Sequence, residues 1–515
     1  MPEKDPYHFD QKNFFSTLES NVNAIKSVSS IVETTIGPKG LDTMMVDEAG
    51  NSLVTNAGAA ILSKMKIDHP VARMIVKVAH AQQKKVGDGT TTATLLTAAL
   101  VEEGAKQILR GVPTQKVVAG IEQGIDFAVK KITEHSYAIQ GLEDEWLNRI
   151  ALTASRGNED LTLSVIDAAQ MIGLEKLMDK RFRLADCVVA HSQADSIVFM
   201  GIFVQQSRMN PQMPTYKKDV SVLTLNDALE PELLTKDALC TEAGISKQEQ
   251  LMDEFKAICK KIVELKIGLV VASGSVHRLA EEILTDADVI VVPNVDPQNL
   301  VQVAEHTGAR PIKRNSLHKS AKDLQSLLGS CEEVEDDELL NWIRISGGQG
   351  KESATILIGA ATEEVVEERE RICKDTASAV QAAAREGFVP GGGSIELAVA
   401  CELEQYVHKI QGLERYGISV VAEALHRPIY HVIANAGFNP LEKIEEIKRA
   451  QKKTHTFSLG LHCDNGAVSD MIELGVVDPL LIKCNALQTA AEVSTTILRI
   501  HNMVQMQPAN FTELS

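Results

Sequence analysis

The hydrophobic pattern of this chain changes twice along its length, and this change constrains the fold more than any other feature. Between residues 14 and 135 the apolar residues recur at intervals of three and four, which is typical of amphipathic helices. Residues 266–306 instead alternate between strand and helix patterns, and the helical pattern returns from about residue 360 to Arg499. The pattern therefore predicts two mainly helical flanks around a central α/β domain of roughly 150 residues.

Individual elements follow from the same periodicity. In the first flank we expect helices over residues 14–35, 71–84, 91–109 and 113–135 and strands over 43–46 and 52–55. The central domain contains a strand, helix, strand, helix series over 267–272, 276–284, 289–292 and 299–306. Within 233–260, apolar residues are spaced among many charges with Gly244 in the middle, which predicts two helical pieces. The polar tail 505–515 is expected to fray.

Composition limits both the core and the partners. Hydrophobic residues make up 44% of the 515 residues and charged residues 24%, which is ordinary for a globular protein. Aromatic residues are only 4%, so the cores must be built from Ala, Val, Ile and Leu, and this favours a mostly helical architecture. The formal net charge of -18 gives no global attraction for nucleic acid or for an anionic membrane, so we expect neither as a partner.

The cysteines and the start of the chain bear on its compartment. The 8 cysteines are scattered and form no C-x-x-C pair, which indicates buried thiols in a reducing compartment rather than a zinc or disulfide framework. The chain begins without a cationic and apolar leader, and it contains no run of about 18 apolar residues. We therefore expect a cytoplasmic protein without a transmembrane segment.

The sharpest local signal is a box of small and hydroxylated residues directly ahead of a helical run: Gly87, Asp88, Gly89, Thr90, Thr91 and Thr92. Glycines admit a close ligand, a helix N-terminus offers unpaired amides and the hydroxyls add donors, so the box suits a phosphate chain. Asp88 would repel phosphate unless a cation lay between them, which points to Mg²⁺. The same residues are also compatible with a plain turn and helix cap.

Two further glycine turns lie far apart, at residues 35–40 and 390–393. Each alone is compatible with an ordinary loop. A ligand shared by all three turns would require the helical flanks to fold together and the centre to be an insertion. Asp375 lies on a helical stretch ahead of the last turn, where it is either a solvated surface residue or a base for water.

Three common motifs are absent. Gly350 and Lys351 suggest a P-loop, but the position five residues before Gly350 is Ile345 rather than glycine. The α/β segment has a single glycine, Gly274, where a dinucleotide fold needs a series, and the histidines form no H-E-x-x-H motif. A P-loop, a Rossmann dehydrogenase and a catalytic zinc are therefore not expected.

With these motifs in order, the chain resembles a chaperonin subunit of the type that carries its own lid, as in the archaeal thermosome and the eukaryotic cytosolic chaperonin. The resemblance rests on four motifs at family-like separations, over residues 35–40, 87–92, 388–393 and 475–479. A threonine closes the second motif where many relatives have serine, which is compatible with the archaeal-like bacterial subgroup. The resemblance implies a multidomain chaperonin fold, mostly α with an α/β apical domain.

The resemblance also implies how the domains are arranged. A helical equatorial ATP-binding domain would comprise residues 1–142 and 397–515, and a hinge-like intermediate domain would comprise 143–208 and 355–396. The apical domain would comprise 209–354, with a helical protrusion over about 233–260 that forms the built-in lid. Identical or related subunits would form stacked rings around non-native polypeptides, with no separate lid protein.

Functional residues are carried over from the family by position. The resemblance implies ATP and Mg²⁺ as cofactors, with Asp88 as the metal ligand and Asp375 as the catalytic residue that orients the attacking water. Asp478 would accept the ribose hydroxyls, Gly392 would lie against the nucleoside, and Arg156 would stand where relatives often place a lysine that senses the γ-phosphate. The other residues implied in ATP binding are Thr35, Gly37, Pro38, Gly89, Thr90, Thr91 and Thr92.

One position departs from the family pattern. Relatives usually carry an aspartate between residues that match Asn56 and Gly58, where this chain has Ala57. A methyl group neither accepts a proton nor holds a metal-bound water, and losing such a group commonly costs about 10²–10⁴-fold in rate. We therefore predict ATP binding with very slow hydrolysis. Two rivals remain open: a monomeric ATP-dependent transferase, and a non-enzymatic scaffold that keeps nucleotide or ring contacts only.

Overall fold

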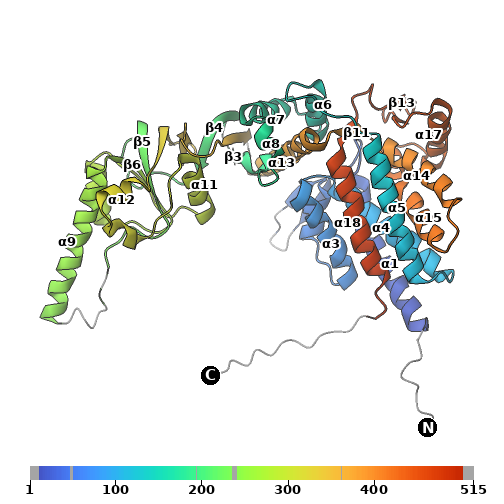
Figure 1. Cartoon of the computed structure of the whole chain (residues 1–515), viewed down its shortest axis with the longest axis horizontal. Helices are drawn as coiled ribbons and strands as arrows, with labels where there is room; N and C mark the ends of the chain where they lie inside the picture. Colours follow the sequence, from blue (N-terminus) through green and yellow to red (C-terminus); the bar gives the residue numbers. More distant parts are fainter. Residues whose placement is uncertain are drawn as a thin grey trace, which may run out of the picture. The chain divides into compact units, whose positions relative to one another are not determined.

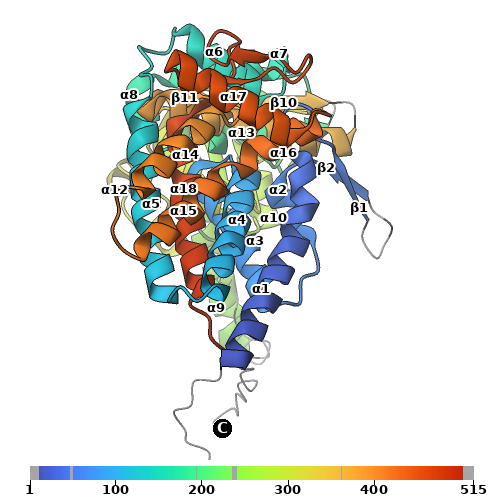
Figure 2. The same ribbon diagram turned by 90° about the vertical axis from the view of Figure 1, so that its right-hand side faces the viewer.

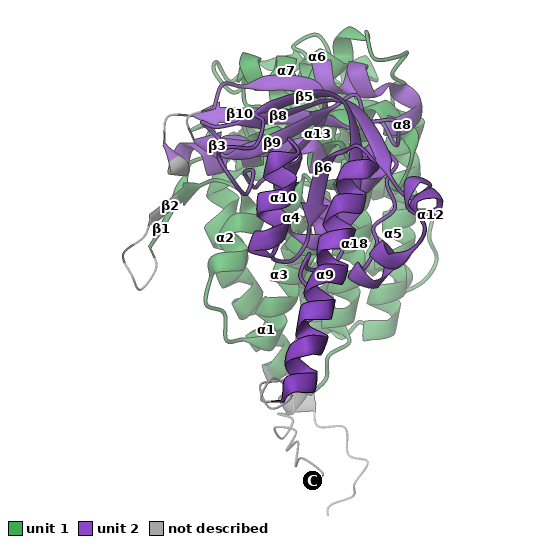
Figure 3. Ribbon diagram, turned by 90° about the vertical axis from the view of Figure 1, so that its left-hand side faces the viewer, with its two compact units in different colours: residues 1–166, 177–185, 371–515 green, residues 167–176, 186–370 purple. Residues whose placement is uncertain are grey.

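The computed structural model describes residues 11–46, 50, 52–192, 194–232, 234, 241–360 and 362–502. Contacts divide the chain into two compact units (Figure 3). Unit 1 comprises residues 1–166, 177–185 and 371–515, and unit 2 comprises 167–176 and 186–370. Both ends of the chain therefore belong to one unit, and the middle of the chain forms the other. The boundaries of the three predicted domains stay predictions, and the predicted fraying of 505–515 lies outside the described residues.

Unit 1 is built around long helices that lie side by side (Figures 1 and 2). The central helix α4 contacts α1, α3 and α18, and α5 contacts α15 and α18. The long helices are α1 (Gln11–Val32), α3 (Pro70–Val86), α4 (Thr90–Leu109), α5 (Thr114–Glu134), α15 (Glu414–Leu425) and α18 (Leu480–Leu498). Around them lie η1 (Glu33–Thr35), α2 (Gly58–Lys64), α6 (Glu145–Ala154), α14 (Ser394–Val407), α16 (Arg427–Asn435) and α17 (Pro440–Thr454).

The core of unit 1 confirms the expectation of small aliphatic packing. In the main cluster of the described part, every buried member except Cys484 is Ala, Val, Ile or Leu. Its centre is α4, where Leu96, Leu100 and Val101 are buried together with the hydroxyls of Thr94 and Thr97. These hydroxyls donate to the carbonyls of Thr90 and Ala93 one turn earlier, so they bring no unpaired polar group into the core.

Short antiparallel strand pairs complete unit 1. β1 (Thr43–Val46) pairs with β2 (Ser52–Thr55), and both strands have the predicted bounds. The other pairs are β11 (Phe388–Pro390) with β14 (Val477–Pro479) and β12 (Leu459–Leu461) with β13 (Val468–Asp470). Four helices contain residues of both units: α7 (Glu159–Ile172), α8 (Leu174–Met178), η2 (Leu184–Cys187) and α13 (Glu363–Glu386).

Unit 2 contains an eight-stranded mixed sheet in the order β3-β10-β4-β9-β8-β5-β6-β7. The two strands of the predicted strand and helix series are β6 and β7, which pair in parallel, and β5, which lies outside that series, pairs in parallel with β6. Successive residues of β6 alternate between two apolar clusters: Leu269 and Val271 pack with α11, whereas Val270 and Ala272 pack with α9 and α10. The strands are β3 (Val188–Ser192), β4 (Ile197–Val204), β5 (Tyr216–Leu225), β6 (Ile267–Ala272), β7 (Ile290–Val292), β8 (Gly329–Asp337), β9 (Trp342–Ser346) and β10 (Ala354–Ala360). Because helices cover both faces of β6, its sequence is a continuous run of apolar residues.

The prediction of two helical pieces within 233–260 is wrong for the described part of that segment. One continuous helix, α9 (Glu242–Glu264), replaces them, and residues 233 and 235–240 lie outside the described residues. Gly244 does not break the helix because it lies in the first turn, where its amide donates to the Thr241 hydroxyl cap at 3.0 Å. The other helices of unit 2 are α10 (Arg278–Asp286), α11 (Pro297–Thr307), η4 (Arg314–His318) and α12 (Ala321–Gln325).

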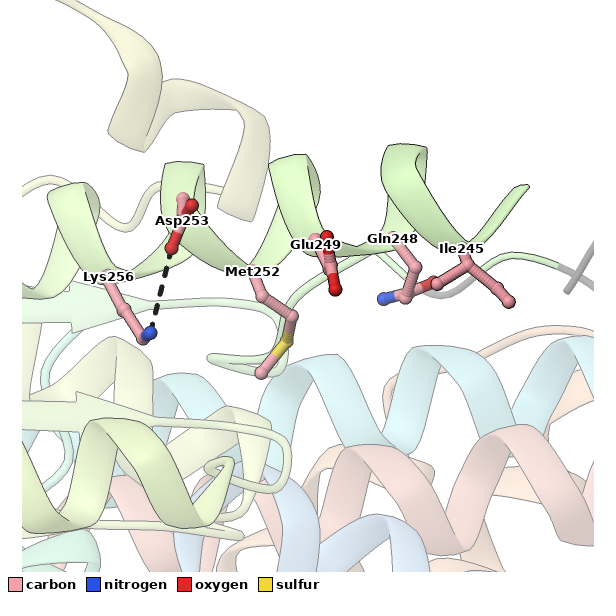
Figure 4. Close-up of a pocket in the computed structure, with 6 residues that line it drawn as sticks. All are labelled: Ile245, Gln248, Glu249, Met252, Asp253 and Lys256. Carbon is pink, nitrogen blue, oxygen red and sulfur yellow. Dashed lines mark ion pairs between the residues drawn. The ribbon is translucent and has the colours of Figure 1, made fainter. Parts of the chain in front are cut away.

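The two halves of α9 differ in their surroundings. The second half packs Phe255, Ile258 and Ile262 into the core of unit 2. The first half carries Ile245, which is 51% exposed. A surface hollow of about 410 Å³ lies along this helix. Figure 4 shows the side chains that line it: Ile245, Gln248, Glu249, Met252, Asp253 and Lys256. The start of the helix is therefore held by its Thr241 cap and by hydrogen bonds between Gln248 and the backbone of Glu232 and Leu234.

Candidate functional site

The glycine and threonine box forms the junction between α3 and α4. Gly87 ends α3 and Gly89 precedes α4, and both have left-handed backbones with φ of 78°. Such angles favour glycine because a Cβ would strain the backbone. No side chain caps α4, a helix of 20 residues, so its first amides and its positive dipole end are available to an anion. The local geometry is therefore that of a phosphate-binding turn.

Other segments of unit 1 pack closely around this junction. A Cβ on Gly87 would overlap the hydroxyl of Ser378 on α13, and a Cβ on Gly89 would lie 2.7 Å from the side chain of Ile482 on α18. The two glycines thus permit approach of α13 and α18 as well as the turn itself. The box is thereby held between segments that are about 300 and 400 positions away in the sequence.

Gln82 fixes the backbone of the box, and sequence reasoning missed it. This fully buried side chain donates through Nε2 to the carbonyl of Asp88 at 2.9 Å and to that of Ile482 at 3.2 Å. Its Oε1 accepts from Nδ2 of Asn485 at 2.6 Å. Gln82 therefore connects the Asp88 turn to the last helix of unit 1. Only the buried position of a glutamine on the apolar face of α3 could have indicated this role.

Asp88 stands among other charged groups. Burial and the neighbouring carboxylate of Asp478 raise the pKa of Asp88, while the amide of Gly89 and the cations Arg371 and Arg156 counteract this. Like charges that face each other with partial burial favour a bound cation. The described residues contain no group of three His, Cys, Asp or Glu side chains that could hold a metal by themselves. A Mg²⁺ here would depend on Asp88 and on ligand oxygens, which is its usual way of binding beside phosphates.

Asp375 on α13 is held beside Asp88. Its Oδ2 pairs with Nη1 of Arg371 at 2.7 Å, one helical turn earlier, and its Oδ1 accepts a weak contact from Nε2 of Gln83 at 3.5 Å. Gln83 also donates to the carbonyl of Gly87 at 2.9 Å. Burial raises the pKa of Asp375 to about 7, with Arg371 lowering it and Asp88 raising it. A carboxyl with such a pKa is suited to proton transfer near neutral pH.

The third segment is the pair of strands that carries Asp478. Asp478 on β14 lies opposite Val389 on β11, and the amide of Gly391 donates to the carbonyl of Val476 at 2.9 Å. Gly391 would bring a Cβ to 3.1 Å from Asp478 Oδ2. Gly392 has φ of 63° and faces Met471. The pairing therefore places the triple glycine next to Asp478, and Asp478 lies close enough to Asp88 to affect its pKa.

The turn with Thr35, Gly37 and Pro38 is packed nearby but is not joined to the carboxylates. Asn435 on α16 donates to the carbonyl of Ile36 at 2.9 Å, and a Cβ on Gly37 would lie 3.2 Å from the Val432 side chain. The preceding η1 contacts both α4 and α16. The Thr35 hydroxyl donates to the carbonyl of Val32 at 2.8 Å. Within the described ranges, no hydrogen bond or ion pair connects this turn to Asp88, Asp375 or Asp478.

Two residues complete the surroundings. Arg156 follows α6 with φ of 58°, is exposed, and lowers the pKa values of both Asp88 and Asp375 by its charge. Ala57 is the N-cap residue of α2 and provides no side-chain hydrogen bond there. The next residue, Gly58, lies so close to the box that a Cβ on it would be 2.5 Å from the Thr91 hydroxyl. Ala57 therefore stands beside the residues predicted to bind phosphate.

Together these residues offer the parts that a magnesium nucleotide needs. The glycine turns and the α4 amides suit phosphates, Asp88 suits a cation, and Asp478 suits donor hydroxyls. Asp375 suits proton transfer, and Arg156 adds positive charge. All of them belong to unit 1, although they come from both ends of the chain.

Comparisons with known proteins give one consistent family. The sequence model of the TCP-1/cpn60 chaperonin family matches residues 28–508. Thermosome subunit alpha of Thermoplasma acidophilum is 30% identical over 505 residues, 94% of this chain and 91% of that protein. Thermosome subunit 1 of Haloferax volcanii is 30% identical over 497 residues, 94% of this chain and 88% of that protein.

A solved structure agrees with these relatives. The crystal structure of a group III chaperonin in the open state is 39% identical, covers 96% of this chain and 100% of that chain, and has a TM-score of 0.87. The predicted chaperonin fold is thereby confirmed. Across the part of the chain that the structure describes, no helix combines the length and apolar character needed to cross a bilayer.

Proposed function

The chain belongs to the TCP-1/cpn60 chaperonin family, and from this premise we propose that it is a subunit of an ATP-dependent folding chamber. Subunits of this kind would form a double ring around non-native polypeptides in the cytoplasm. The proposal also names ATP and Mg²⁺ as the cofactors. The observation that carries it is the meeting of Asp88, Asp375 and Asp478 beside two glycine turns in unit 1.

Each part of the site then has a role toward the nucleotide. The α4 amides with Gly89, Thr90, Thr91 and Thr92 would bind the phosphates, aided by the turn at Thr35, Gly37 and Pro38 and by Arg156. Asp88 would hold Mg²⁺, which supplies positive charge to the phosphates when bound. Gly392 and Asp478 would contact the nucleoside. Asp375 would orient water and accept its proton.

Closure of the chamber is the second part of the proposal. Asp375 lies on α13, a helix that contains residues of both units. Rotation about this helix upon nucleotide binding would link the site to unit 2 and to α9, whose first half would form the built-in lid. Non-native polypeptides would meet apolar positions of unit 2 while the chamber is open. No separate lid protein would be required.

An alternative is favoured by one residue. Ala57, the neighbour of Gly58, carries a methyl group where the family pattern has a carboxylate that would act on metal or water. A subunit with this change would keep nucleotide affinity and ring contacts but hydrolyse ATP very slowly. It would then act as a hydrolysis-impaired scaffold within a ring.

One experiment separates these functions from a monomeric enzyme. Light scattering on the purified chain, with and without ATP and Mg²⁺, should give a mass of many subunits, and the same sample should refold a denatured client when ATP is added. Client binding that ignores nucleotide would favour the scaffold. A 56.0 kDa monomer would refute the chamber and leave the small-molecule transferase.

A further inference from the structure

Two buried charged residues, Lys483 and Glu396, lie directly behind Asp478. Lys483, in the first turn of α18, bonds through Nζ to Glu396 on α14 and pairs with Asp478 Oδ2 at 2.8 Å. The side chains of Lys483 and Glu396 are only 11% and 2% exposed. Burial disfavours the charge on Lys483, but Asp478 and Glu396 outweigh it and raise the pKa of the lysine. The two carboxylates therefore hold Lys483 in its charged form.

Stability alone does not explain this arrangement. Oε2 of Glu396 is buried, and among the described residues it has no hydrogen-bond partner. A buried carboxylate with an unpaired oxygen is costly, and apolar residues of similar volume often replace a buried ion pair at no loss of stability. The charges must therefore serve some other purpose, and Asp478 is the one member that reaches the surface, with 32% of its side chain exposed.

The lysine determines which oxygen of Asp478 is available. Oδ2 is engaged by Lys483 and lies close to Gly391, whereas Oδ1 accepts no hydrogen bond within the described part of the chain. A carboxylate fixed through one oxygen keeps a defined orientation and presents the other as an acceptor. Two neighbouring hydroxyls of a sugar are the natural donors for such a group.

We propose that Lys483 and Glu396 are positioning residues that hold Asp478 to accept the ribose hydroxyls and so make the site prefer ribonucleotides. Neither residue touches the nucleotide. Lys483 orients Asp478, and Glu396 supplies the second negative charge that keeps the lysine in place. This inference rests on the proposed function, because it deepens the nucleotide site described above.

The test compares ATP with 2′,3′-dideoxyATP, which lacks both hydroxyls. Dissociation constants for each nucleotide with Mg²⁺ are measured by calorimetry on the full chain and on the double variant Lys483→Met, Glu396→Leu. Hydrogen bonds to a charged group are worth about tenfold or more in affinity, so the parent should prefer ATP by at least that factor. The double variant should bind both nucleotides with affinities within about twofold of each other, at the level of the parent with 2′,3′-dideoxyATP.

The choice of variants separates positioning from folding. Lys483→Met alone would leave Glu396 charged and unpaired in the core, whereas the double variant removes both charges together. Glu396→Gln keeps an acceptor for Lys483 and should retain the preference for ATP. The inference would be overturned if the folded double variant still preferred ATP as the parent does, or if the parent bound both nucleotides equally. Either result would leave the proposed function standing. A parent that binds neither would refute the proposed function and this inference with it.

Discussion

Ala57 is the residue whose replacement tests the chemistry of the site most directly. It caps α2 without a side-chain hydrogen bond, and its neighbour Gly58 packs against Thr91. Ala57→Asp would supply both a helix cap and a carboxylate beside the phosphate turn. We expect ATP turnover to rise by about 10²-fold or more and the free energy of unfolding to rise by about 1 kcal/mol. Steady-state hydrolysis and urea denaturation measure the two effects.

Ala57→Asn is the matched control for that change. Asparagine caps a helix as well as aspartate does, but it carries no charge and accepts no proton. It should therefore raise stability by a similar amount and leave the rate unchanged. Equal turnover of the aspartate variant and the parent chain would rule out the idea that Ala57 limits hydrolysis.

Asp375 leads to a prediction about pH. Its pKa is raised from the ordinary 3.8 to about 7, and a base acts only when ionised. Hydrolysis should therefore fall about tenfold per pH unit below pH 7 and level off above it. Arg371 lowers this pKa, so Arg371→Gln should move the fall in hydrolysis rate to higher pH. Lys84→Gln, at an exposed lysine of α3, should not move it. If the rate of Arg371→Gln fell at the same pH as that of the parent, Asp375 would be excluded as the group that causes the fall.

The same pKa has a consequence for stability. Because the folded state holds the proton of Asp375 more tightly than the unfolded state, the folded state is favoured below about pH 4, and this contribution is lost as pH rises to about 7. Asp375→Asn carries no charge at any pH. Relative to the parent it should gain stability at pH 8 and show no gain at pH 4. Urea midpoints at both pH values check this, and a gain that is equal at both would contradict it.

The roles of individual site residues could be predicted only where residues adjacent in the sequence form the site. Asp88 and its box could be recognised because glycine, aspartate and threonine stand together ahead of a helix. Gln82, Asn485, Lys483 and Glu396 could not, because each acts through a partner far away in the chain. Gln82 and Asn485, for example, are 403 positions apart. Only the packing of α18 against α3, and the Lys483–Glu396 interaction between α18 and α14, bring these residues together.

At the scale of elements, glycine sets how closely α5 and α15 approach. A Cβ on Gly120 would overlap the carbonyl of Glu414 and lie 2.7 Å from Cα of Gly417. These are backbone atoms, so a helix must move. Gly120→Ala should therefore lower the free energy of unfolding by about 2 kcal/mol or more, despite the better helix propensity of alanine, and the urea midpoint measures this.

Gly104 provides the comparison for Gly120. It lies within α4, and its added Cβ would meet only the end of the Leu498 side chain, at 2.6 Å. A flexible side chain can shift, and alanine gains about 1 kcal/mol of helix propensity, so Gly104→Ala should be nearly neutral. Equal losses in Gly104→Ala and Gly120→Ala would show that backbone contact does not decide the cost.

Elements with a strong period were predictable, and their local exceptions were not. The strands 43–46 and 52–55 have the predicted bounds, and the helix predicted over 91–109 begins one residue earlier, at Thr90, because a short-range pattern encodes these elements. The continuity of α9 could not be seen from Gly244, since a glycine in the first turn of a helix costs little when the Thr241 cap holds its amide. The helix is continuous because Gly244 lies in its first turn rather than in its middle.

At the scale of the whole molecule, the change of hydrophobic pattern predicted that the centre is inserted between two flanks. The described contacts agree, because unit 2 spans most of residues 167–370 and unit 1 joins both ends of the chain. How many subunits assemble cannot be predicted in this way, because surface residues carry no periodic signal. Exposed apolar residues are the better guide to assembly.

The β1–β2 hairpin is such a surface, and it gives the final prediction. Met44 and Val46 are 66% and 64% exposed, and Val54, paired with Met44, is 46% exposed. A two-stranded hairpin is marginally stable alone, so apolar residues on it favour pairing with a second copy in the proposed ring. The double variant Met44→Glu, Val46→Glu should lower the mass measured by light scattering without changing the helical content. Leu441→Glu, at a 72% exposed leucine on α17, should assemble normally, and an intact ring in the double variant would show that the hairpin makes no subunit contact.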